Sequence, residues 1–290
     1  MNENLKSLKA KKNLQFFLEK NNKLKRNKAI QMSYDIRSGS SIKNFSKRKN
    51  FFSIYIEEVA NLISKNFPET ETVLDCGAGE LVTSNLISKK LKNLKKMYCF
   101  DFSFKRLLDG KNNLKKVSEK KTLSIFSADM FNIPLPDNSI DLVTTYQALE
   151  PNGYSEYKLI KELLRVSKKG LFLMEPDFEN GSYAQKRRMK KLNYIKNLPG
   201  VIKKLGQKFK VIKMKNYSNP LNKCSAYVVF KKISKKINQP NFVDPINKNK
   251  LKENDNHLYD QVNGHLYFKF NSIPILIREK ALFVPFVKKI

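Results

Sequence analysis

The chain has 290 residues and carries 57 Lys and Arg against 26 Asp and Glu, a formal net charge of +31. This length accommodates one sizeable domain with appendages, and no apolar run approaches the roughly 20 residues that a membrane span requires. The cysteines Cys76, Cys99 and Cys224 show no paired spacing, so the sequence favours reduced thiols and a cytoplasmic location over a disulfide framework.

The N-terminal residues 1–50 are basic, and we expect them to form a separate segment or lid. A short amphipathic helix is predicted around residues 14–18, and a loop at residues 32–40. Residues 51–64 then carry apolar side chains at helical spacing, which predicts a helix that packs on the core.

An acid and two glycines lie at the end of the first predicted strand. Asp75 is near the end of that strand, and Gly77 and Gly79 follow it. The glycines permit a tight turn and a close approach of the backbone to a ligand. Ligands of open α/β sheets bind beyond the carboxyl ends of the strands, so the motif predicts both a fold and a nucleoside-type ligand. A turn with a purely structural role is the alternative.

The sequence departs at two positions from the dinucleotide-binding pattern G-x-G-x-x-G, and these departures indicate which nucleoside-type ligand binds. Val82 stands at the third glycine, and Glu80 places an anion where a pyrophosphate would bind. That charge tolerates a cationic ligand, and S-adenosylmethionine (SAM) carries a sulfonium and an ammonium. SAM is therefore the predicted cofactor.

Acids also follow the second and third predicted strands. Asp101 ends the second strand, where its carboxylate can accept hydrogen bonds from two ribose hydroxyls or cap the next helix. Asp129 follows the third strand and can accept the adenine amino group, while Met130 offers the ring a polarizable contact. Three neighbouring strands thus contribute one carboxylate each.

Strands and helices alternate from residue 72 onwards, which predicts a parallel sheet with helices on both faces. Two strands then follow each other directly near the end of the pattern. The strands are expected at residues 72–76, 96–101, 122–126, 140–145, 170–175, 209–214 and 226–230, and the helices at 81–91, 104–117, 155–166 and 184–205.

Together these motifs resemble the class I SAM-dependent methyltransferases, in particular their type 11 subgroup, over roughly residues 50–233. Residues 73–80 resemble the first motif of that family, and residues 134–143 its lead into the fourth strand. The resemblance implies an α/β fold with a Rossmann-like seven-stranded sheet, whose last strand is antiparallel, and helices on both faces. It also implies an enzyme, with Tyr34 and Arg37 as candidates for a cover over the cofactor or for a surface turn.

The family resemblance places the cofactor at the ends of the first four strands. The expected cofactor-binding residues are Asp75, Gly77, Ala78, Gly79, Asp101, Phe102, Asp129, Met130 and Tyr146. Methyl transfer mainly needs an aligned acceptor, although a nitrogen or hydroxyl acceptor can also need a base. The candidate catalytic residues are Tyr146, Glu150 and Glu175, and the alternative for the two glutamates is that they bind backbone amides and hold loops.

The C-terminal residues 237–290 form a third expected unit, after 1–50 and the methyltransferase domain at 51–236. Residues 273–276 resemble the end of a zinc-ribbon domain of the methyltransferase-activator type. Asp244 stands at the place of the first metal-binding cysteine, no cysteine follows Cys224, and a structural zinc site needs four soft or imidazole ligands. We therefore predict a small α+β appendage that binds no metal.

The acceptor is predicted from a weaker resemblance to methyltransferases that occur with surface-polysaccharide enzymes. It rests on residues 175–177, 187–189 and 219–222 and on Tyr194, and it implies a sugar or nucleotide-linked sugar. Arg187 and neighbouring basic residues would then bind a phosphate, or merely form a solvated face. The alternatives are a tRNA or rRNA methyltransferase, motivated by the charge and the tail, and a non-catalytic SAM-binding or partner protein.

Overall fold

The computed structural model describes residues 14–21, 25–114, 123–217, 222–232, 234 and 236–285. The first 13 residues of the basic N-terminal segment lie outside this part of the chain, as do residues 219–221 of the proposed acceptor signature. None of the helices in the described ranges is long and apolar enough to cross a bilayer.

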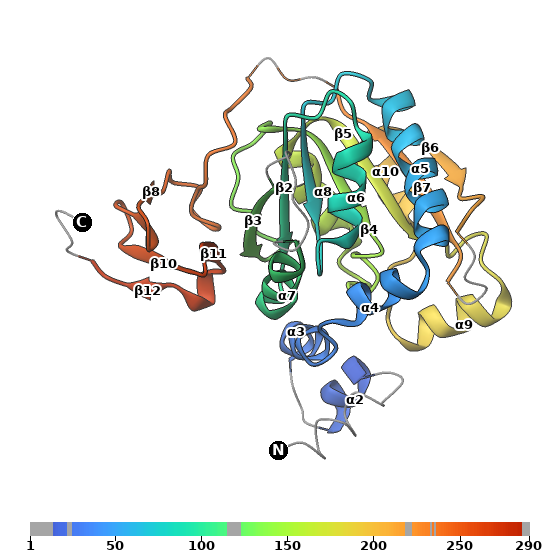
Figure 1. Cartoon of the computed structure of the whole chain (residues 1–290), viewed down its shortest axis with the longest axis horizontal. Coiled ribbons are helices and arrows are strands. Elements are labelled where there is room, and N and C mark those ends of the chain that lie inside the picture. The colour runs from blue at the N-terminus through green and yellow to red at the C-terminus, as the bar shows by residue number, and fades with distance from the viewer. Residues whose placement is uncertain are drawn as a thin grey trace.

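A mostly parallel sheet forms the centre of the molecule (Figure 1). Its strands run in the order β6-β7-β5-β4-β1-β2-β3, and β7 pairs antiparallel with both β5 and β6. This topology confirms the expected Rossmann-like methyltransferase sheet with its antiparallel last strand. The strands are β1 (Thr72–Cys76), β2 (Lys96–Asp101), β3 (Leu123–Ala128), β4 (Ile140–Tyr146), β5 (Ser167–Pro176), β6 (Lys208–Lys213) and β7 (Cys224–Phe230).

Helices cover both faces of the sheet, as the alternating pattern predicted. Successive side chains of a strand point to opposite faces, so Val73 packs in one core cluster and Leu74 in the other. The cluster of Val73 includes α5 (Lys49–Asn66), α6 (Val82–Lys90) and α7 (Phe104–Leu114), whereas that of Leu74 includes α8 (Glu156–Val166) and α10 (Leu198–Lys204). The buried strands place their carboxyl ends at one edge.

The N-terminal segment is more helical than expected. It contains α2 (Leu14–Asn21), α3 (Arg26–Ile36) and α4 (Ser40–Lys47), so the loop predicted at residues 32–40 is wrong except for the turn at residues 37–39. Only Ala29, Ile30 and Ser33 of α3 are buried, and the many polar residues around them hide the helical pattern. Gly39, with φ of 91°, separates α3 from α4.

The single helix predicted at residues 184–205 is also wrong, because it divides into α9 (Tyr183–Lys191) and α10. Asn193 and Asn197 lie between the two and adopt positive φ values of 50° and 53°, which asparagine tolerates better than most residues. The Asn197 side chain caps α10, and Pro199 occupies its first turn, where a missing N–H costs nothing.

The C-terminal residues extend the sheet. β11 (Ile273–Leu276) pairs parallel with β3, and its Ile273 and Leu276 enter opposite core clusters. Figure 1 shows these last strands beside β3, at the edge away from β6. The other elements of this part are β8 (Lys252–Glu253), β9 (His257–Asp260), β10 (His265–Phe270), the 3-10 helix η1 (Arg278–Lys280) and β12 (Leu282–Phe283).

Candidate active site

A cavity of about 630 Å³ opens at the carboxyl ends of β1, β2, β3 and β4. This volume suits a drug-sized ligand, because such pockets commonly measure about 300–1,000 Å³. One end contains most of the predicted cofactor residues, namely Asp75, Gly77, Ala78, Asp101, Phe102, Asp129 and Met130, together with Glu80 and Arg106. The other end is lined mainly by aromatic side chains from α5, β4 and the segment after β6.

The glycine loop lies against the end of β2. The N–H groups of Gly77 and Ala78 both donate to the carbonyl oxygen of Phe100, each at 2.8 Å. Gly77 has φ of 78°, and a Cβ there would lie 2.5 Å from that of Ala148, so a larger residue cannot fit without movement. Gly79 has φ of 55° but does not line the cavity, because the guanidinium of Arg106 covers it.

Asp75 carries an unusual carboxylate at the end of β1. Its Oδ2 accepts a hydrogen bond of 2.5 Å from Ser84, whereas its Oδ1 is buried and has no partner among the described residues. Burial raises the pKa of Asp75 to about 7, against the effect of the Ser84 hydroxyl. The hydroxyl of Tyr146, which also lines the cavity, is likewise buried and without a partner in that part of the chain.

Asp101 fixes the turn after β2. Its two oxygens each accept one backbone N–H at 2.8 Å, from Gly79 and Ser103, and so keep capacity for further hydrogen bonds. Burial raises the pKa of this carboxyl, although the nearby Arg106 and the two N–H groups oppose the rise. Asp101 can therefore serve both predicted roles, the helix start and the ribose.

Asp129 and Met130 line the same end of the cavity, directly after β3. The Oδ1 atom of Asp129 accepts the N–H of Phe131 at 3.0 Å, which leaves its other oxygen for a ligand. Burial raises the pKa of Asp129, and the charges of Glu279 and Glu162 add to the rise. Glu279 comes from the C-terminal part, which thus approaches the expected adenine site.

The predicted catalytic residues separate into two groups. Tyr146 lines the cavity, whereas neither Glu150 nor Glu175 is among the described residues that do. Glu175 accepts the N–H groups of Ala148 and Leu149 at 3.1 and 3.3 Å, and Glu150 accepts the side-chain N–H of Asn222 at 2.6 Å. The contacts of Glu175 are those of the alternative role, in which it holds the loop after β4.

Burial raises the pKa of both glutamates, and that of Glu175 reaches about 8. The negative charge of Glu150 adds to the rise in the pKa of Glu175, because two like charges repel.

The aromatic end of the cavity was not predicted as a site. Phe51 stacks on Tyr55 with ring centroids 6.0 Å apart, and Tyr55 lies 5.7 Å from Tyr217. Tyr146 and Met174 complete this wall. The sequence shows the side chains of α5 only as a core stripe, and they face the same space as Tyr146 because α5 packs beside β4 and β5.

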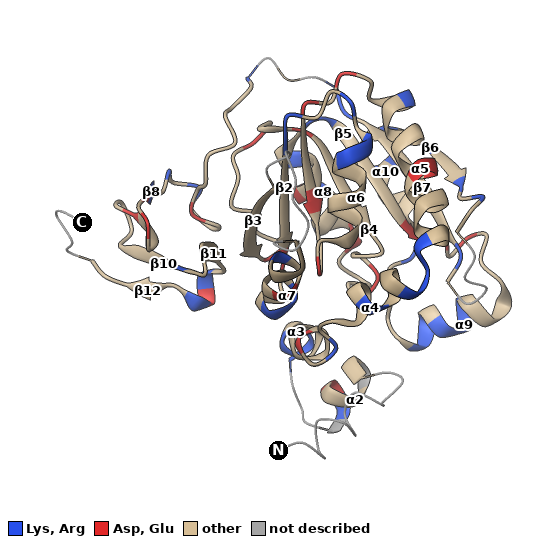
Figure 2. Cartoon of the chain, in the orientation of Figure 1, with Lys and Arg blue, Asp and Glu red and all other residues tan. Residues whose placement is uncertain are grey.

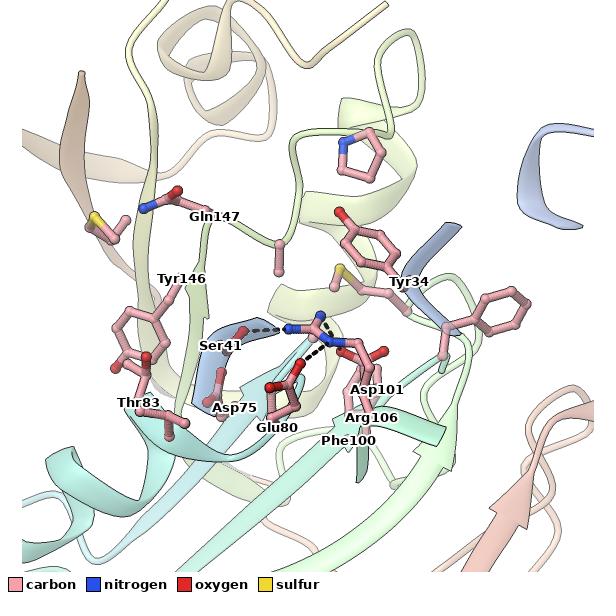
Figure 3. Close-up of a pocket in the computed structure, with 18 of the residues that line it drawn as sticks. Tyr34, Ser41, Asp75, Glu80, Thr83, Phe100, Asp101, Arg106, Tyr146 and Gln147 are labelled. Carbon is pink, nitrogen blue, oxygen red and sulfur yellow. Dashed lines mark hydrogen bonds and ion pairs between the residues drawn. The ribbon is translucent and has the colours of Figure 1, made fainter. Parts of the chain in front are cut away.

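An arginine network, also absent from the sequence predictions, crosses the cofactor end (Figure 3). Arg106 of α7 donates from Nε to Glu80 at 3.3 Å and from Nη2 to Ser41 at 3.0 Å. The ring of Tyr34 lies 5.2 Å from the guanidinium and lines the cavity. Helices α3 and α4 therefore contribute to the cavity wall, and Glu80 also accepts the N–H of Ile42 at 2.9 Å.

The C-terminal part contains a second cluster of acids. Asp244, Asp260 and His265 offer possible ligand atoms within 4.8 Å of one another. The oxygens of Asp244 are already engaged, since Oδ1 accepts two backbone N–H groups and Oδ2 accepts the hydroxyl of Tyr267 and the guanidinium of Arg278. The absence of a metal stays a prediction.

Residues 74–174 match the type 11 family described as "Methyltransferase domain". This segment is therefore a methyltransferase domain. No curated protein matches the chain. Among solved structures, a SAM-dependent methyltransferase from Methanococcus maripaludis has 18% identity and a TM-score of 0.50, over 68% of this chain and 93% of its own.

Two further structures share the methyltransferase fold at low identity. Magnesium protoporphyrin IX methyltransferase from Synechocystis PCC 6803, with bound SAH, matches 69% of this chain and 99% of its own, with 11% identity and a TM-score of 0.52. A complex of the Haloferax volcanii Trm112 methyltransferase activator with a methyltransferase matches over 68% of this chain and 96% of the matched chain, with 13% identity and a TM-score of 0.52.

SAM is the cofactor expected of this methyltransferase domain, and the residues that line the cavity fit that molecule. The unpartnered Oδ1 of Asp75 offers a negative charge to a cationic ligand. Asp101 and Asp129 retain free acceptor capacity at the ends of the next two strands. These carboxylates suit a ligand that combines a positive charge with hydroxyl and amino donors.

Proposed function

We propose that the enzyme methylates a small molecule, and that this acceptor is a sugar or a nucleotide-linked sugar. The observation that carries the proposal is a single cavity with a carboxylate-lined end and an aromatic end. Because the glycine loop, Asp75 and Tyr146 line this common space, a cofactor at one end can face an acceptor at the other. A site of this size and enclosure favours a small acceptor.

The cofactor-binding roles follow the strand ends. We assign the adenine to Asp129, Met130 and Phe102, the ribose to Asp101, and the cationic part to Asp75. Gly77 and Ala78, which line the cavity, supply the close backbone approach. These assignments rest on the free acceptor capacity of the three carboxylates, together with their position in one cavity.

The acceptor end combines aromatic rings with amide side chains. Aromatic rings can pack on the C–H faces of a sugar, and the side chains of Gln147, Asn44 and Asn152, which line the cavity, can hydrogen-bond its hydroxyls. Arg48 also lines the cavity, and α9 carries a run of basic residues nearby (Figure 2). We propose that these cations bind the phosphate of a nucleotide-linked acceptor.

The chain's own contribution to the reaction is alignment. SAM supplies an already activated methyl group, so the residues must hold an acceptor oxygen or nitrogen in line with it. We propose that the free hydroxyl of Tyr146 contacts the acceptor and is the catalytic residue at the cavity wall. Glu150 and Glu175 lie behind the residues that line the cavity, and they position the loop that carries Gln147 and Ala148.

We also propose the division of the chain into residues 1–50, 51–236 and 237–290, with the last unit docked on β3. A cytoplasmic location stays a prediction, based on three cysteines that are buried and unpaired. The number of subunits is left open.

The test is methyl transfer from radiolabelled SAM to a panel of nucleotide sugars, with total tRNA and rRNA as parallel acceptors. Transfer to a nucleotide sugar, reduced at least about tenfold by Tyr146→Phe through loss of one hydrogen bond, is the expected result. Transfer to RNA alone, with a steep salt dependence, would replace the sugar by nucleic acid. SAM binding without transfer to either class would favour a non-catalytic protein.

A further inference from the structure

The guanidinium of Arg106 occupies the space directly above the glycine loop. A Cβ built on Gly79 would lie only 2.4 Å from its Nη2 atom. The loop is built for a close ligand approach, and in this structure the group that approaches it is a side chain of the same chain. Nη1 lies 3.8 Å from Oδ2 of Asp101, a longer separation than the hydrogen bonds of Arg106 to Glu80 and Ser41 (Figure 3).

Arg106 is held in place by an anchored partner. The Glu80 side chain is fully buried, and its second oxygen accepts the N–H of Ile42 from α4. Arg106 is itself only 16% exposed at its side chain. Because one hydrogen bond goes to Glu80 and one to Ser41, the guanidinium keeps further N–H donors that can turn toward a ligand.

The charges at this end of the cavity require a cation for one part of SAM. The methionine part of SAM carries an α-carboxylate, and Asp75, Glu80 and Asp101 are all acids. A carboxylate placed among them without a partner would be strongly disfavoured. The described arginines that line the cavity are Arg48 and Arg106, and Arg48 lies over the ring of Phe51 at the acceptor end.

We propose that Arg106 binds the α-carboxylate of the methionine part of SAM. This inference rests on SAM occupying the cavity. The guanidinium keeps its contact with Glu80, gives up the long contact with Asp101 to the ribose, and directs its free donors at the carboxylate. Arg106 is thus a binding residue of the cofactor site, and Glu80 positions it.

The deciding experiment compares SAM with decarboxylated SAM, which differs only by loss of that carboxylate. For the wild-type protein and for Arg106→Met, the dissociation constants of both compounds are measured by calorimetry. We expect Arg106→Met to weaken SAM about 10- to 100-fold, the range of a lost charge-assisted hydrogen bond, and to leave decarboxylated SAM within about threefold.

Two further variants provide the controls. Lys105→Met removes the neighbouring cation of α7, whose side chain is 56% exposed, and should change neither dissociation constant. Arg106→Lys keeps the charge without the planar fork, so its loss of SAM affinity should be intermediate. This lysine variant also keeps the test open if the methionine variant does not fold.

Three outcomes would overturn the role of Arg106. Equal weakening of both compounds would mean that Arg106 only supports Asp101 and Glu80. Tighter SAM binding by Arg106→Met would make the arginine a plug that the cofactor must displace. Unchanged SAM binding by Arg106→Met would show that Arg106 does not contact the cofactor. Failure of the wild-type protein to bind SAM is a different result, since it would contradict the cofactor site itself.

Discussion

The cofactor end of the cavity and the C-terminal part both contain buried aspartates, yet the carboxylates of the two regions differ in how many of their oxygens have hydrogen-bond partners. Asp244 has partners at both oxygens, and despite its burial the N–H groups of Asn247 and Ile246, the Tyr267 hydroxyl and Arg278 lower its pKa. Asp75 has one partner, and burial raises its pKa to about 7. A saturated carboxylate holds a fold together, whereas an unsaturated one is available for a ligand.

Two aspartates of the C-terminal part have the same pattern of hydrogen bonds. Asp244 Oδ1 accepts the N–H groups two and three residues ahead, and Asp260 Oδ1 does the same in a second turn. In each turn the carbonyl oxygen of the aspartate also accepts an N–H, from Lys248 and from Gly264, and both of these residues have positive φ. The sequences Asp-x-x-Asn of the two turns are thus an internal repeat.

The largest effect is therefore expected when a saturated carboxylate is removed. Asp244→Ala should lower the free energy of unfolding by about 3–5 kcal/mol, because it removes a fully buried carboxylate that pairs with Arg278 and leaves two backbone N–H groups without their acceptor. Urea unfolding followed by circular dichroism would measure the loss. A loss below about 1 kcal/mol would contradict the structural role of this carboxylate.

Asp75→Asn should act in the opposite direction. A carboxyl whose pKa is raised in the folded protein loses stability as the pH rises from the unfolded value toward the folded one. With a folded pKa of about 7, the wild-type protein should lose stability between about pH 4 and 7 from this group. The asparagine variant should then be more stable by about 2–4 kcal/mol at pH 8 and should show no such gain at pH 4.

Thermal unfolding of the two proteins across this pH range checks the prediction. Asp129→Asn provides a matched comparison, because it removes the charge of another carboxyl whose pKa is raised by burial. A gain for Asp75→Asn that does not depend on pH would show that the carboxylate charge is not its origin.

Asp101→Ala should weaken cofactor binding, in addition to removing the acceptor of the Gly79 and Ser103 N–H groups. Loss of a buried carboxylate that accepts ribose hydroxyls should weaken SAM binding by about 1–3 kcal/mol. In contrast to Arg106→Met, this change should weaken SAM and decarboxylated SAM equally, because both contain the same ribose. Calorimetric titration with the two compounds would show it, and unchanged affinity would remove the ribose assignment.

The sequence predicted those parts of the site that lie within a few residues of a strand end. Asp75, Asp101 and Asp129 could be placed together because the carboxyl ends of neighbouring parallel strands meet at one edge. Arg106 could not, since its position depends on how α7 packs against the glycine loop. The aromatic wall likewise combines side chains more than 160 residues apart, such as Phe51 and Tyr217.

The tail shows a different limit of sequence reasoning. Residues 273–276 stood out only through a resemblance, and their pairing with β3 could not be predicted, because an edge strand carries no sequence mark for the partner that will cover it. The helix α3 was missed since only one narrow face of it is buried. Long-range packing, rather than local propensity, decides in both cases.

The smallest expected effect concerns metal ions at the C-terminal cluster. The guanidinium of Arg278 lies 3.0 Å from Asp244, where it already supplies a positive charge, and the oxygens of Asp260 accept N–H groups from its own turn. Zn²⁺ would have to displace these partners, so neither Zn²⁺ nor a chelator should shift the melting temperature by more than about 1 °C. Ligand at a hundred times its dissociation constant would stabilise the fold by about 2.7 kcal/mol, which is easily measured. A shift of that size in the wild-type protein would mean that the saturated aspartates can exchange their hydrogen bonds for a metal, and the contrast with the cofactor edge would no longer hold.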